Sequence, residues 1–234
     1  MSDFQALVKP LIADIPGWLD DDEGETLYDL ARACTGAGVI VEIGSSRGKS
    51  TVCLGLGSQA GASIPVYAVD PHPGERFADF TANVARARLD DLVRPVASLS
   101  QEAADNFNEP IELLFVDGGH QYEVVLEDFE RWVPKVVEGG WVVFHDTTWA
   151  PGPRKVVGPA IYRSRRFKDV RFVVGSMTVG RKVDGNSLPD RLRGRYVLGV
   201  KTAFWLVSTV LKKRRRLLPK PVERLGRRVL KGIQ

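Results

Sequence analysis

The sequence predicts an α/β fold with a mainly parallel β-sheet. Short apolar, β-branched segments alternate along the 234 residues with longer segments of helical periodicity. Several apolar segments end in a glycine or an aspartate, as at Gly44, Asp70 and Asp117. Because ligands of open α/β sheets bind beyond the carboxyl ends of the strands, these residues predict one shared binding edge.

Helices are predicted at the amino-terminal end. Residues 2–15 are expected to form a short helix that Pro10 and Pro16 limit in length. A second helix is expected after the acidic segment 20–25, and Gly36 is expected to end it. Its apolar residues at helical spacing are Leu27, Leu30, Ala31 and Cys34.

Strands and helices then alternate. The predicted strands are residues 39–43, 66–70, 93–96, 111–117, 140–144, 171–175 and 177–180. The predicted helices are residues 50–58, 75–89, 123–136 and 160–167. The segment 111–117 is almost entirely apolar, which predicts a central strand, and 149–158 is expected to be a Pro/Gly-rich loop. The last two strands are expected to pair through a tight turn.

A glycine-containing turn follows the first strand. A P-loop has four residues between its glycines, whereas three separate Gly44 from Gly48. A dinucleotide fingerprint fails as well, since Ser46 stands where its second glycine belongs. Glycines let the main chain approach a ligand, and the N–H groups of the next helix favour an anionic group. The turn therefore predicts a nucleotide-type site of another kind.

The segment Glu42-Ile-Gly44-x-x-x-Gly48 resembles motif I of class I S-adenosylmethionine-dependent methyltransferases. The resemblance covers about residues 25–182. It implies a Rossmann-like methyltransferase fold, with a seven-stranded, mainly parallel sheet, a C-terminal antiparallel hairpin and helices on both faces. The implied organisation is a methyltransferase domain at 1–182 (N-terminal helices 1–37, core 38–182) and a basic, partly helical C-terminal tail at 183–234.

The resemblance implies S-adenosylmethionine as the cofactor. Asp70 would accept hydrogen bonds from the ribose hydroxyls, and His72 would shape the adenosine pocket. Capping before Pro71 is the alternative role for Asp70, and helix capping is the alternative for Ser98 and Ser100, which would touch the adenine. The implied cofactor residues are Glu42, Gly44, Ser45, Ser46, Gly48, Ser50, Asp70, His72, Ser98, Ser100 and Asp117.

A second group of residues carries the chemistry. With motif I and Asp70, the Asp117-Gly-Gly-His120 segment resembles the metal-dependent and macrolide-sugar O-methyltransferases. A hydroxyl acceptor needs a general base or a cation that lowers its pKa. The resemblance implies His120 as this base, with Asp117 as the second catalytic residue. His145 is expected to point away into packing.

The same resemblance implies a metal site and an acceptor site. Asp117 and Asp146 match positions that hold Mg²⁺ in those families, and Thr147 stands where the catechol-type enzymes have Asn. Acceptor contacts are expected from three further side chains, namely Tyr122, Trp149 and Arg154.

Charge is distributed unevenly along the chain. The net charge is +4, yet residues 181–234 contain 16 Lys and Arg against three acidic residues, so this end is strongly basic and the remainder acidic. The apolar segment 203–211 is too short to cross a bilayer, and it directly precedes the basic run 212–216. This pattern predicts an interfacial helix on an anionic membrane surface through residues 201–218. Contact between copies of the chain and nucleic-acid binding are the alternatives, in that order.

The predicted function is transfer of a methyl group to a hydroxyl of a small-molecule or saccharide acceptor, including a lipid-linked one. The alternatives are a P-loop-like NTPase, since Gly48-Lys49-Ser50 ends as a P-loop does, and a related-fold hydroxylase or non-catalytic binding protein of the cephalosporin-hydroxylase-like group. Cys34 and Cys53 lack metal-binding spacing. With no signal-peptide pattern at the start, the chain is expected to be cytoplasmic, either free or peripheral at the inner face of the membrane.

Overall fold

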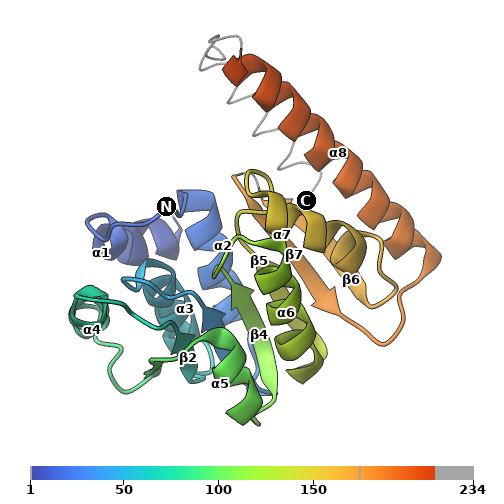
Figure 1. Ribbon diagram of the computed structural model, residues 1–234. Helices are drawn as coiled ribbons and strands as arrows, with labels where there is room; N and C mark the ends of the chain where they lie inside the picture. Colours follow the sequence, from blue (N-terminus) through green and yellow to red (C-terminus); the bar gives the residue numbers. More distant parts are fainter. Residues whose placement is uncertain (1, 174, 214–234) are drawn as a thin grey trace.

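Seven strands form one sheet in the order β3-β2-β1-β4-β5-β7-β6 (Figure 1). The computed structural model describes residues 2–173 and 175–213. The strands are β1 (Val39–Ile43), β2 (Val66–Val69), β3 (Val93–Val96), β4 (Ile111–Val116), β5 (Val136–Phe144), β6 (Phe167–Val173) and β7 (Met177–Lys182). β1 to β5 pair in parallel, whereas β7 is antiparallel to both β5 and β6. The predicted fold class and its antiparallel C-terminal pair are confirmed.

Helices surround this sheet (Figure 1). They are η1 (Phe4–Val8), α1 (Lys9–Ile12), α2 (Asp21–Arg32), α3 (Lys49–Ala60), α4 (Arg76–Arg86), α5 (Ser100–Asn106), α6 (Tyr122–Trp132), η2 (Val133–Lys135), α7 (Pro151–Val157), η3 (Gly158–Tyr162) and α8 (Leu188–Lys213). α2 packs closely against α3, and α6 packs against both α5 and α7. The two groups cover both faces of the central strands, and β1 and β4 are accordingly buried along their whole length.

The sheet reverses its strand order between β1 and β4. Every residue of these two strands is buried, and β1 continues through β2 and β3 while β4 continues through β5. A crevice opens beyond the carboxyl ends at such a reversal, which is where ligands of open α/β sheets bind. The fold therefore positions the site between the loops that follow Ile43 and Val116.

Two predicted segments differ from the structure. The expected loop 149–158 contains α7. Pro151 stands at the start of this helix, where the N–H that proline lacks would have no partner within the helix. The expected helix 160–167 lies earlier, as η3, and Phe167 already begins β6. α5 was not predicted.

α8 has one docked part and one projecting part (Figure 1). Val197 is buried, and a Cβ added to Gly194 would lie 2.5 Å from the carbonyl oxygen of Tyr162. In the part of the chain that the structure describes, no helix is both long and apolar enough to cross a membrane. Most of the predicted basic run 212–216 lies outside the described residues.

Candidate active site

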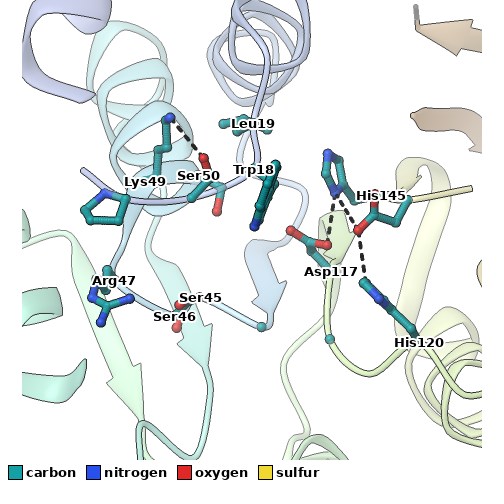
Figure 2. A pocket seen from close by; sticks show the side chains of 15 residues that line it. Trp18, Leu19, Ser45, Ser46, Arg47, Lys49, Ser50, Asp117, His120 and His145 are labelled. Atoms are coloured by element: carbon teal, nitrogen blue, oxygen red, sulfur yellow. Dashed lines mark hydrogen bonds and ion pairs between the residues drawn. The ribbon is translucent and has the colours of Figure 1, made fainter. Parts of the chain in front are cut away.

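A cavity of about 250 Å³ lies where the strand order reverses (Figure 2). Three parts of the chain surround it: the glycine turn after β1, the loops after β4 and β5, and an N-terminal loop before α2. The lining residues are Pro16, Gly17, Trp18, Leu19, Gly44, Ser45, Ser46, Arg47, Lys49, Ser50, Asp117, Gly118, His120, His145 and Asp146. The structure thus brings the predicted cofactor turn and the predicted catalytic residues to one space.

Glycine is required at the turn after β1. Gly44 has φ +89°, and a Cβ there would lie 2.2 Å from the carbonyl oxygen of Asp117. Gly48 also has a positive φ, +85°, immediately before α3. Only glycine adopts these angles readily and lets the two loops approach so closely. Lys49 and Ser50, the first residues of α3, line the cavity, and the free N–H groups at the start of a helix suit the anionic carboxylate of an amino-acid group.

Glu42 in β1 stabilises this turn through side-chain hydrogen bonds. Its side chain is fully buried within β1, and the hydroxyls of Ser50 and Thr51 donate hydrogen bonds to its two carboxylate oxygens. Burial raises the pKa of Glu42 to about 7, although the two hydroxyl donors oppose the shift. Glu42 therefore anchors the first turn of α3 to the sheet, while Ser50 itself reaches the cavity.

Asp70 and His72 brace the other side of the turn. The backbone N–H of Ser46 donates to Asp70 Oδ2 (3.0 Å), and that of His72 donates to Asp70 Oδ1 (2.7 Å). The His72 ring lies 3.0 Å from the Ser46 carbonyl oxygen and packs against Phe80. Each Asp70 oxygen keeps a second lone pair, so the ribose contact stays a prediction.

Ser98 and Ser100 lie outside the cavity lining formed by the described residues. The Ser98 hydroxyl donates to the side chain of Glu102 (3.2 Å), and that of Ser100 donates to Asp128. Both hydroxyls bind side chains of α5 and α6, and neither caps α5, whose N-cap residue is Leu99. Their adenine contact stays a prediction.

Two carboxylates and an imidazole meet on the opposite side of the cavity. One ligand atom each of Asp117, His120 and Asp146 lies within 4.8 Å of the others. His120 Nε2 is 3.0 Å from Asp146 Oδ2 (Figure 2). Asp146 follows β5 with φ +53°, a conformation that aspartate tolerates better than most residues and that turns the chain sharply here. His120 is half exposed and so remains accessible from the cavity.

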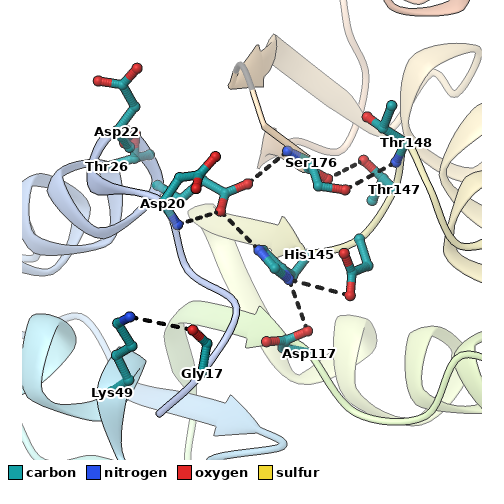
Figure 3. Close-up of polar contacts among 12 residues, drawn as sticks. Gly17, Asp20, Asp22, Thr26, Lys49, Asp117, His145, Thr147, Thr148 and Ser176 are labelled. Carbon is teal, nitrogen blue, oxygen red and sulfur yellow. Dashed lines mark hydrogen bonds and ion pairs between the residues drawn. The ribbon is translucent and has the colours of Figure 1, made fainter. Parts of the chain in front are cut away.

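His145 lies buried between three carboxylates (Figure 3). Its Nδ1–H donates to Asp117 Oδ1 (3.1 Å) and lies 3.7 Å from Asp146 Oδ2, while its Nε2–H donates to Glu23 Oε2 (3.0 Å). Burial alone lowers the pKa of His145, but hydrogen bonds to the carboxylates outweigh burial and raise this pKa to about 12. The ring is an imidazolium. The prediction that His145 points away from the site was wrong, because its Nδ1 faces Asp117.

Glu23 of α2 is the residue that sequence reasoning missed here. Besides His145, it accepts hydrogen bonds from the backbone N–H groups of Ser176 (2.7 Å) and Asp20 (3.0 Å) (Figure 3). Asp20 and Glu23 form a capping box at the start of α2, a spacing visible in the sequence. That signal indicates a helix start, but nothing in it indicates a partner 122 residues away.

The pKa values of the two carboxylates of the cluster shift in opposite directions. Burial raises the pKa of Asp117, against the opposing effect of His145. The hydrogen bond with His145 lowers the pKa of Asp146, which burial only partly offsets. Asp146 is therefore the firmly ionised member, and it is the one in contact with His120.

Thr147 does not join this cluster, which corrects the predicted ligand set. Its side chain is fully buried, and its hydroxyl donates to the Ser176 carbonyl oxygen (2.8 Å) and lies 2.8 Å from the Thr178 hydroxyl. His120 takes the third position instead. Mg²⁺ prefers six oxygen ligands, whereas imidazole suits softer ions, so two carboxylates and a histidine fit Mg²⁺ poorly.

The predicted acceptor residues lie beside the cavity lining, on the side of α7 and α8. Trp149 packs against Phe204 of α8, with ring centroids 6.1 Å apart. The guanidinium of Arg154 lies 4.0 Å from the ring centroid of Trp205, also on α8. Tyr122 begins α6 and is partly exposed. Their acceptor contacts stay predictions.

The N-terminal loop also contributes residues that the sequence analysis missed. Trp18 is 94% exposed yet lines the cavity, facing the space between Ser50 and Asp117 (Figure 2). Lys49 Nζ donates to the Gly17 carbonyl oxygen (3.3 Å), which ties the loop to α3. Pro16-Gly17 marks a turn in the sequence, but nothing there indicates that Trp18 lines the cavity.

Comparisons with known proteins agree with this architecture. Residues 41–147 match the sequence profile of a methyltransferase domain. An uncharacterised protein of Sinorhizobium fredii is 34% identical over 120 residues, 46% of this chain and 13% of that protein. One of Acanthamoeba polyphaga mimivirus is 32% identical over 72 residues, 30% of this chain and 29% of that protein. The chain thus spans less than a third of the length of these relatives.

Solved structures share the fold. A cofactor-bound protein from MTB aligns with a TM-score of 0.62 at 19% identity, covering 80% of this chain and 92% of that one. The O-methyltransferase from Bacillus cereus in complex with SAH aligns with a TM-score of 0.57 at 19% identity, covering 76% and 90%. The O-methyltransferase NovP gives 0.56 at 17% identity, covering 70% and 80%. At these identities the likeness concerns the fold.

Proposed function

Because this chain carries a class I S-adenosylmethionine-dependent methyltransferase domain, we propose that it transfers the methyl group of S-adenosylmethionine to a hydroxyl oxygen of a small-molecule or saccharide acceptor. One observation supports the choice of a hydroxyl: the His120–Asp146 pair lies across the cavity from the glycine turn. A nitrogen acceptor that is already uncharged needs no such base, whereas a hydroxyl does.

The glycine turn and the start of α3 would hold the amino-acid part of the cofactor. The close approach at Gly44 and the exposed N–H groups after Gly48 suit this group, and Asp70 would accept hydrogen bonds from the ribose. The bound cofactor supplies a methyl group on a good leaving group. The protein's task is then to align the acceptor oxygen and to remove its proton.

His120 would remove that proton. His120 Nε2 lies 3.0 Å from Asp146 Oδ2, so a proton on Nε2 would face this carboxylate and Nδ1 would be the basic atom. The ionised Asp146 also stabilises the imidazolium that forms when Nδ1 takes the proton from the acceptor hydroxyl. This arrangement needs no metal, and because the donor set fits Mg²⁺ poorly, no step of the proposal passes through one.

Asp117 would orient the acceptor. It lines the cavity next to His120, and its Oδ1 is fixed by the hydrogen bond from His145. His145 is held in turn by Glu23 on its far side. With Oδ1 bound to His145, Asp117 Oδ2 would accept a hydrogen bond from a neighbouring hydroxyl of the acceptor or from the cofactor amine, while the reacting hydroxyl gives its proton to His120.

Calorimetric titration with S-adenosylhomocysteine tests the cofactor without knowledge of the acceptor. Labelled S-adenosylmethionine with a panel of hydroxylated sugars and catechols, with EDTA or with added Mg²⁺ or Mn²⁺, then tests the transfer. We expect binding and label transfer that survive EDTA. Absence of binding overturns the proposal. Tight ATP binding instead supports the P-loop alternative, and cofactor binding without transfer to any acceptor class supports a non-catalytic binding protein.

A further inference from the structure

α8 has an apolar stripe along its exposed side. Its six large exposed apolar residues are each 49–59% exposed, namely Leu188, Leu192, Tyr196, Leu206, Val207 and Val210. At about 100° per residue, all six fall within an arc of about 100° around the helix. Exposed Gly199 and Ala203 lie within the same arc, so no charged side chain interrupts the stripe.

The opposite side of α8 makes the contacts with the domain. Val197 is buried, and Phe204 packs against Phe172 with ring centroids 5.7 Å apart. Lys201 is also buried, with Nζ 3.3 Å from the Thr178 hydroxyl. These residues account for the docking of the helix, so the stripe is not needed for it. An exposed apolar face of this length marks an interaction site.

The charge around the stripe favours an anionic partner. Arg191 and Arg195 flank it on one side and Arg193 on the other, and the sequence continues into the basic run Lys212-Lys-Arg-Arg-Arg216. A second copy of the chain would bring like charges together along a shared stripe, which is unfavourable. A bilayer that contains anionic lipid supplies apolar depth and negative headgroups together.

We propose that the apolar stripe of α8 lies in the interface of a membrane containing anionic lipid, with the flanking arginines at the headgroups. The helix then lies parallel to the surface, and the domain stays in water beside it. This proposal stands independently of the proposed methyl transfer, because it rests on α8 alone.

Sedimentation of the full chain with lipid vesicles tests this proposal. Vesicles of phosphatidylcholine alone are compared with vesicles that also contain phosphatidylglycerol, at low salt and at about 500 mM NaCl, where surface charges are strongly screened. We expect the protein to pellet with the anionic vesicles at low salt. At high salt, its partition onto the same vesicles should weaken by about fivefold or more. Failure to pellet with anionic vesicles at low salt overturns the proposal.

Paired variants separate the stripe from net charge. Leu192→Glu with Leu206→Glu places two charges in the stripe, whereas Thr81→Glu with Ala82→Glu adds the same charge at exposed positions of α4. We expect about a tenfold loss of vesicle binding in the first pair and little loss in the second. Equal binding by both pairs overturns the proposal. So does a dimer, seen by light scattering, that only the stripe pair abolishes. Affinity for S-adenosylhomocysteine, measured on the same samples, reports whether the domain is folded.

Discussion

The two sides of the cavity are built from interactions of different range. On the side of β1 and β2, Glu42 is bound by residues eight and nine positions away, and Asp70 binds backbone N–H groups two and 24 positions away. On the side of β4 and β5, Glu23, Asp117 and His145 come from separate parts of the chain. The first side is thus held together by interactions within residues 42–72. The second is a charge network that exists only after folding.

The comparison implies that a substitution on one side should spare the other. His120→Ala removes the proposed base on the β4 and β5 side, so we expect the rate of methyl transfer to fall by about 10²–10⁴-fold, the usual contribution of a positioned base. Affinity for S-adenosylhomocysteine should stay within about twofold, because the cofactor turn is untouched. Label transfer and calorimetry on the same preparation measure both. A full rate in the variant would place the base elsewhere.

Asp70→Ala is the converse test, on the side of β1 and β2. Its two oxygens accept the Ser46 and His72 amides and would also accept the ribose hydroxyls. We expect affinity for S-adenosylhomocysteine to fall by about 100-fold, since hydrogen bonds to charged groups contribute about 1.5–3 kcal/mol each and 1.4 kcal/mol is tenfold. Asp70→Asn keeps one acceptor oxygen, so its affinity for S-adenosylhomocysteine should lie between those of the unsubstituted protein and Asp70→Ala. Unchanged affinity in Asp70→Ala would remove Asp70 from the cofactor site.

Glu42, on the side of β1 and β2, should make the free energy of unfolding depend on pH. Its pKa rises from 4.5 to about 7 on folding, so the folded protein retains a proton there that the unfolded chain releases. Stability is therefore lost as the pH rises through this window, by about 2.5 kcal/mol between pH 5 and pH 8 at 1.36 kcal/mol per pKa unit. The neutral variant Glu42→Gln should lack this loss.

Urea unfolding of both proteins at pH 5 and pH 8 measures the effect. The difference in free energy of unfolding should move in favour of Glu42→Gln by about 2.5 kcal/mol over that interval. Parallel pH dependence in the two proteins would mean that Glu42 is ionised in the folded state throughout.

The same difference in range explains what the sequence could predict. Strands 39–43 and 93–96 were predicted at their observed bounds. The first is a short β-branched segment before a glycine turn, and the second follows the predicted helix 75–89, where an α/β pattern predicts a strand. α7 was missed because its prolines read as loop residues, although Pro151 stands where a helix accepts proline.

The site residues show the same contrast between local and long-range interactions. Gly44 and Gly48 were predicted from their own spacing, and the structure has the positive φ angles there that only glycine adopts readily. Glu23 and the orientation of His145 could not be predicted, because their contact depends on how α2 packs across the end of β5. Asp146 and Thr147 were both predicted to face the site, but only Asp146 lines the cavity. The left-handed backbone conformation of Asp146 turns the chain there, and the Thr147 hydroxyl donates to Ser176 instead.

Replacing Trp18 should give the smallest effect, and it tests whether this side chain forms part of the acceptor site. Its side chain is almost fully exposed, so Trp18→Ala should change the free energy of unfolding by no more than about 0.5 kcal/mol. Acceptor binding would bury the ring, so we expect KM for the acceptor to rise about tenfold while kcat changes little. Leu7→Ala, at another exposed apolar position outside the cavity lining, is the matched control. Equal kinetics in both variants would assign Trp18 to the surface, and a lower kcat at unchanged KM would assign it to alignment of the acceptor.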